Sequence, residues 1–141
     1  MRPRSGSTLV EQTVLITILG LCLTVAAHTS QRALHSASVH SASRAVVELL
    51  LFARDRAMAT GTRTALLLDN QHGRVVVHTD LDTLARLELA STHHVHIEST
   101  RDSLAYAPSG LGYGAANLRV IIGRGAVRDT ITVSRLGRVK R

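Results

Sequence analysis

The sequence predicts an α+β protein in which a long N-terminal helix packs on a head built from an antiparallel β-sheet. Three observations support this prediction. Residues 29–60 contain neither proline nor glycine, so a helix that starts in the apolar N-terminal run can continue through them. After Gly61 the apolar residues occur in short runs of high β propensity. Turn sequences at 69–73 and 123–125 separate these runs, as is typical of hairpins.

The first element is an apolar helix. From Leu9 to Ala27 the only ionisable side chain apart from the Cys22 thiol is Glu11. As a helix this run would be about 28 Å long, close to the thickness of a bilayer's hydrocarbon core. Arg2 and Arg4 precede it, so the positive-inside rule places the N-terminus in the cytoplasm and the rest of the chain on the other side.

Three interpretations of this run are open. The first is a secretory signal peptide cut after Ala27, which would release a soluble periplasmic binding module. The second is a plain membrane anchor. The third is a membrane segment in which the carboxylate of Glu11, at the membrane end of the run, has a function, because a charge there is costly and is usually paired or functional.

The second element is an amphipathic stem helix over residues 29–60. Its apolar residues recur near helical spacing, which indicates one face turned toward a core. We expect Leu49, Leu50, Phe52 and Ala53 to be core residues. Gly61 is the expected stop.

The head, residues 61–141, is expected to be made of consecutive hairpins. Residues 80–92 are expected to be a polar connection with at most one helical turn, and 108–114 a flexible loop. The expected strands are 62–68, 74–79, 94–98, 104–107, 118–122, 128–134 and an edge strand at 135–139.

Composition and charge limit the kinds of domain and of binding surface that the chain can form. The 141 residues with 45% hydrophobic content fit one folded domain, and a single cysteine excludes a disulfide framework. Seven of the 17 Lys and Arg residues lie after residue 118, where Asp129 is the only acid. The C-terminal end is therefore a local basic patch on a nearly neutral body.

Catalytic and metal sites are not expected. No Gly-x-Ser-x-Gly elbow surrounds Ser109, and the glycines at 110–114 lack the lysine of a phosphate loop. His94 and His96 would share one strand face, but two ligands without a third partner make a weak zinc site. We expect no enzyme activity, no metal and no cofactor.

The N-terminal residues Gly6, Ser7 and Thr8-Leu9-Val10-Glu11 resemble the class III leader of type IV pilins and type II secretion pseudopilins. That leader is short, basic and ends in glycine, and the hydrophobic helix after it starts with Thr-Leu-Val-Glu. The order of elements in the rest of the chain resembles the GspH/FimT branch of this family. That branch has an aromatic-Pro-Gly loop, matched by residues 106–112, and a closing Gly-Arg, matched by Gly137 and Arg138.

The resemblance implies a pilin-like minor pseudopilin without catalytic activity. A prepilin peptidase would cut after Gly6, and Ser7 would be N-methylated. Glu11 would neutralise the N-terminal amine of a neighbouring subunit during assembly. The implied parts are a leader (1–6), a transmembrane and filament-core helix (7–28), a stem helix (29–60) and a β-rich head (61–141).

The same resemblance implies partners and a location. The partners are other pseudopilins or pilins, the peptidase, an inner-membrane assembly platform and the lipid bilayer. The protein would cross the bacterial inner membrane once, with its head in the periplasm, and would enter a type II secretion pseudopilus or a type IV pilus. The alternative within the family is a FimT-like minor pilin that binds DNA for uptake through Arg138, Lys140 and Arg141.

Overall fold

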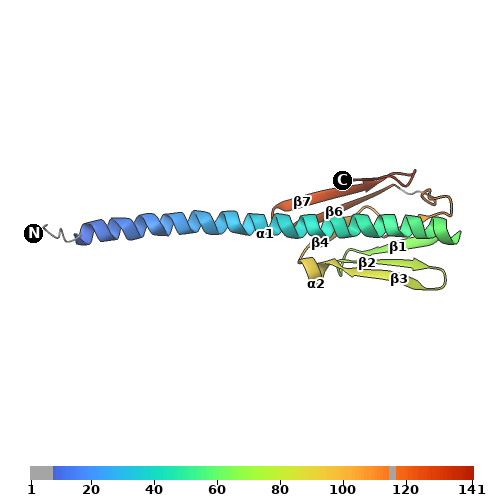
Figure 1. Ribbon diagram of the computed structural model, residues 1–141, viewed down its shortest axis with the longest axis horizontal. Helices are drawn as coiled ribbons and strands as arrows, with labels where there is room; N and C mark the ends of the chain where they lie inside the picture. Colours follow the sequence, from blue (N-terminus) through green and yellow to red (C-terminus); the bar gives the residue numbers. More distant parts are fainter. Residues whose placement is uncertain (1–7, 115–116) are drawn as a thin grey trace, which may run out of the picture. The chain divides into compact units, whose positions relative to one another are not determined.

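The computed structural model describes residues 8–114 and 117–141, with the side chains of 26–28 left aside. The chain has two compact units, Met1–Leu34 and His35–Arg141. Helix α1 (Leu9–Thr60) begins in the first unit and ends in the second, and the other elements belong to the second unit (Figure 1).

The described part of the second unit contains eight strands and one short helix besides α1. They form two four-stranded antiparallel sheets, in the orders β3-β2-β1-β5 and β4-β6-β7-β8. The α+β prediction is therefore confirmed, with two sheets where the sequence indicated one. The elements are β1 (Thr64–Asp69), β2 (Arg74–Thr79), β3 (Thr83–Glu88), α2 (Leu89–His93), β4 (His96–Ser99), β5 (Ser103–Tyr106), β6 (Leu118–Arg124), β7 (Val127–Val133) and β8 (Val139–Lys140).

One stripe of α1 forms the centre of the core. Its buried members recur every three or four residues, as expected for one helix face, and they share a single cluster with side chains of both sheets. Figure 1 shows β1, β2 and β3 on one side of the helix and β6 and β7 on the other. The buried stripe consists of Val39, Ala42, Ser43, Val46, Leu50, Ala53 and Ala57.

The predicted stem core is correct in part. Leu50 and Ala53 are buried, and Leu49 is half-buried against the core. The prediction for Phe52 is wrong, because its side chain is 43% exposed. It lies two positions from Leu50 and one from Ala53, so the helical twist turns it away from the buried stripe although it is the most apolar candidate.

The first hairpin forms where the sequence predicted it. Asp69 pairs with Arg74 at the end of the β1–β2 ladder, and its carboxylate accepts a bond of 3.0 Å from the His72 backbone N–H. A 2.9 Å ion pair joins the carboxylate to Arg74. The bond from the His72 backbone and, after it, the His72 and Arg74 side chains lower the pKa of Asp69 to about 2, although partial burial opposes the shift.

The segment after this hairpin was predicted correctly only in part. Residues 80–92 contain strand β3 where a polar connection was expected, whereas helix α2, which starts within this segment, corresponds to the expected helical turn. Strand β3 is the edge of its sheet and pairs only with β2, with a bulge between Val77 and His78. Its charged side chains Arg86 and Glu88 form a 3.2 Å ion pair on the surface, which is why the segment resembles a loop in sequence.

The C-terminal edge strand is shorter than predicted. Only Val139 and Lys140 pair with β7. Residues 134–138 form a turn instead, closed by bonds from the Gly137 N–H to the Ser134 carbonyl and from the Ser134 N–H to the Arg138 carbonyl, both 2.9 Å.

This closing turn depends on the absence of a side chain at Gly137. Gly137 has φ +74°, and a Cβ there would lie 2.5 Å from the Gly110 carbonyl oxygen. That oxygen accepts a 3.0 Å bond from Nε of Arg54 on α1. Gly137, the glycine of the Gly-Arg pair seen in the sequence, thus lets the closing turn approach the 107–112 loop and the helix.

We predict that Gly137→Ala lowers the free energy of unfolding by about 2 kcal/mol or more. The alanine would have to adopt a left-handed backbone conformation, and its Cβ would clash with the Gly110 carbonyl oxygen. Chemical denaturation of the full chain in detergent, followed by circular dichroism, measures this. The control is Gly61→Ala, because Gly61 has φ +64° but open space around its Cβ position. Equal losses in the two variants would contradict the role of the close approach.

Tyr106 is the largest fully buried side chain of the second unit. Within the described residues its hydroxyl has no hydrogen-bond partner. Burial raises its pKa to about 12, against a smaller lowering by Arg54. The folded state therefore keeps the phenol proton at a pH where an unfolded tyrosine has lost it.

We predict that the raised pKa of Tyr106 lowers the free energy of unfolding at alkaline pH. As pH rises from about 9 to 11.5 the unfolded state loses the Tyr106 proton first, so the free energy of unfolding should fall by about 2 kcal/mol from this residue. Tyr106→Phe should remove that part of the pH dependence and leave stability at pH 7 unchanged or higher. Denaturation at both pH values tests this, and a clear loss of stability of the variant at pH 7 would contradict it.

Candidate functional site

The N-terminal turn of α1 places Glu11 next to a helix cap. Thr8 caps the helix, since its Oγ1 accepts a 3.3 Å bond from the Glu11 N–H and its carbonyl accepts a 3.1 Å bond from the Gln12 N–H. Glu11 therefore lies in the first turn, where the helix dipole favours a carboxylate. The predicted cleavage residues Gly6 and Ser7 lie outside the described residues.

The first unit exposes an apolar helix. Every described side chain from Leu9 to Val25 is exposed. The most apolar 18-residue stretch of α1 has a mean hydropathy of 2.0 and no buried residue. By length and composition the helix could cross a membrane.

The polar residues of this stretch are compatible with apolar surroundings. The hydroxyl of Thr13 donates to the Val10 carbonyl, and that of Thr17 donates to the Thr13 carbonyl, both at 2.8 Å. Thr24 makes the same kind of bond at 2.8 Å. Each hydroxyl is thus satisfied by its own helix, which removes most of the cost of placing it in lipid.

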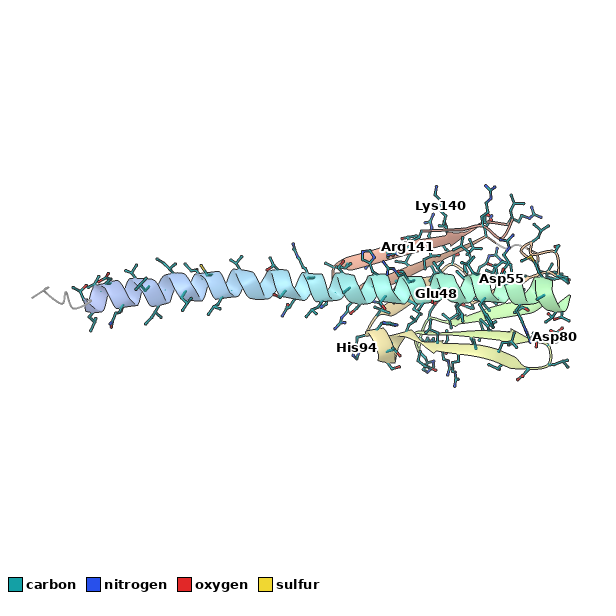
Figure 2. The ribbon with its side chains drawn as sticks, viewed as in Figure 1. Glu48, Asp55, Asp80, His94, Lys140 and Arg141 are labelled. Carbon is teal, nitrogen blue, oxygen red and sulfur yellow. The ribbon has the colours of Figure 1, made fainter. Side chains whose placement is uncertain are left out.

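The structure separates Arg141 from Arg138 and Lys140, the other two C-terminal cations predicted as DNA contacts. Nε of Arg141 donates to the Asp129 carboxylate at 2.6 Å, and its guanidinium also contacts Nδ1 of His40 on α1. Partial burial would raise the pKa of Asp129, but Ser43 and Arg141 outweigh it and hold this pKa below its usual value. Arg141 is thus bound within the unit, while Lys140 points outward (Figure 2).

A groove of about 580 Å³ lies beside these residues. Leu51, Val133 and Val139 supply apolar lining, and Arg54, Arg138 and Lys140 supply positive charge. Arg54 was not singled out from the sequence, because nothing local distinguishes an arginine on a stem helix. The DNA contact of Arg138, Lys140 and Arg141 stays a prediction.

The histidines do not form the arrangement that the sequence suggested. His94 lies outside β4, at the end of α2 with φ +53°, so it does not share a strand face with His96. In the described part of the chain no three His, Cys, Asp or Glu residues lie together in a way that could hold a metal ion.

Comparison with known proteins supports the fold. No family model and no curated protein sequence matches the chain. Among solved structures, the type IV minor pilin FimU of Pseudomonas aeruginosa is similar at 13% identity with a TM-score of 0.62, over 72% of this chain and 86% of that one. The minor pseudopilin EpsH from the type 2 secretion system of Vibrio cholerae is similar at 12% identity with a TM-score of 0.60, over 73% of this chain and 94% of that one. The chain therefore has the pilin-like fold of the GspH/FimT type.

Proposed function

We propose that this protein is a minor pilin-like subunit, made as a prepilin, anchored in the bacterial inner membrane and built into a type IV pilus or a type II secretion pseudopilus. The observation that supports this most is the fold shared with a minor pilin and a minor pseudopilin. Its role is structural, and its partners are other pilins or pseudopilins together with the assembly platform.

The first unit supports membrane anchoring. An apolar helix whose described side chains are exposed needs lipid or other apolar helices around it. The bilayer would cover it before assembly, and the same helices of other subunits would cover it afterwards. The stem and the two sheets then remain in the periplasm.

Glu11 supports the docking step. Cleavage after Gly6 would create a new amine at Ser7, four residues before Glu11. A carboxylate and an amine from two subunits are each costly in an apolar environment and tolerable as a pair. The amine of an entering subunit would therefore seek the Glu11 of a neighbour and set its axial position.

The first prediction from this proposal concerns processing. Co-expression with a prepilin peptidase should yield a membrane-bound protein whose intact mass corresponds to a start at Ser7, with or without one methyl group. Gly6→Val should stay uncut, because the peptidase must accept the residue before the cut. A soluble product starting near residue 28 would contradict the proposal and favour a secreted binding module.

The second prediction concerns assembly. Glu11→Ala should be processed and inserted like the wild type, since neither step uses the carboxylate, but its recovery with partner pilins after cross-linking in the native host should fall about tenfold or more. Gln12→Ala changes the adjacent residue and serves as the matched control. Equal recovery of Glu11→Ala and Gln12→Ala would exclude the charge-pairing step.

A further inference from the structure

One end of the second unit collects cationic and imidazole side chains from three elements. They come from α1 near His35, from the β6–β7 hairpin on either side of its turn, and from the segment that runs from the end of α2 to the start of β4. Figure 1 shows α2 and the start of β7 at the end where α1 enters this unit. We call this surface the basic end; its members are His35, His93, His94, His96, Arg124 and Arg128.

Contacts between the three elements show that they meet. The guanidinium of Arg124 donates to Ser38 on α1 at 2.6 Å and to the His93 carbonyl at 3.4 Å. A Cβ at Gly125 would lie 2.8 Å from the His35 ring, and one at Gly123 would lie 2.6 Å from the His96 ring. The glycines of the β6–β7 hairpin thus give room to two imidazoles.

The positive charge of the basic end is not neutralised within the unit. In the described residues none of its six members is joined to a carboxylate by an ion pair. The bonds of Arg124 go to a hydroxyl and a carbonyl, which leave its charge in place. Asp129, next to Arg128 in sequence, is paired with Arg141 instead.

His94 ends α2 in the left-handed conformation, and its side chain is exposed. It is the only non-glycine residue with positive φ in the described chain, and its side chain is exposed at the end of α2 (Figure 2). Glycine or asparagine would adopt this conformation at lower cost. The exposed ring of His94 therefore forms part of the surface of the basic end.

The length of the chain keeps the basic end near the membrane. The apolar run ends at Ala27 and the second unit begins at His35. However the two units are arranged, the intervening chain spans about 12 Å as a helix and less than about 30 Å when extended. It contains Arg32 and no acid, and no acid occurs between Glu11 and Glu48. A headgroup layer a few ångströms thick borders the hydrocarbon on each side.

We propose that the basic end is a docking surface for anionic phospholipid headgroups, which holds the second unit against the membrane before assembly. This inference rests on the membrane anchoring proposed above. Each arginine near an anionic surface favours the docked state about fivefold. The anchor has already removed the translational cost of encounter, so a few such contacts are sufficient.

The test places one fluorophore in the β6–β7 turn of the full chain. Cys22→Ser removes the native thiol, and Ala126→Cys carries bimane at an exposed position of the turn. The protein is reconstituted in vesicles containing a lipid with a headgroup spin label, which quenches nearby bimane. In one vesicle preparation the unlabelled lipid is phosphatidylcholine alone, and in the other it includes 30 mol% of the anionic lipid phosphatidylglycerol.

We expect at least twofold stronger quenching in the phosphatidylglycerol vesicles, lost in 0.5 M salt because exposed charges are screened. Arg128→Gln with His94→Asn should reduce the quenching toward the phosphatidylcholine value; asparagine accepts the backbone of His94. The matched control Arg119→Gln removes an exposed arginine from the neighbouring strand β6, at the end of the β6–β7 ladder away from the turn, and should quench like the parent.

A second reporter separates failure of the inference from failure of the anchor. Bimane at Ile16→Cys should be quenched by a lipid spin-labelled in its acyl chain if the first unit spans the membrane. Quenching at 16 with no effect of lipid charge at 126 would overturn the inference, leave the anchor intact and favour an acidic protein as the partner of the basic end. No quenching at 16 would overturn the anchor and the inference together.

Discussion

Both sheets of the second unit pack on one helix with almost no aromatic side chain between them, and this constraint determines the rest of its structure. The chain has one phenylalanine, two tyrosines and no tryptophan, and of these only Tyr106 is buried. The helix face is made of small and branched side chains, such as Ala42, Ala53 and Val46. The cores of the two sheets join through this stripe into one cluster.

The end of the chain is attached to the helix at two places. Arg54 reaches the carbonyl of Gly110, against which the closing turn packs through Gly137. Arg141 connects Asp129 on β7 to His40 on α1. The groove that contains Arg138 and Lys140 also includes Arg54 and is lined by α1, β7 and β8. The segment that carries Arg138 and Lys140 is thus held to α1 by the contacts of Arg54 and Arg141.

Local patterns allowed much of this fold to be predicted, and long-range pairing explains what was missed. The helix and the two main hairpins follow from periodicity and turn residues. Strand β3 was missed because an edge strand needs little apolar surface, and Phe52 was misplaced because hydrophobicity alone does not define a helix face. At the candidate site, the role of Glu11 was predicted from sequence and stays a prediction. The contact of Arg141 with His40 joins residues 101 positions apart, so no short-range sequence pattern could predict it.

Strand β3 has a consequence for how two copies of the chain can meet. It ends its sheet with an Arg86–Glu88 pair and lies beside a bulge in β2. Charges and bulges at a sheet edge hinder hydrogen bonding to a strand of another molecule. At the opposite edge of the other sheet, β8 is only two residues long. Neither β3 nor β8 offers a template for continuous strand addition, so separate copies of the chain are protected from aggregating through these two edges.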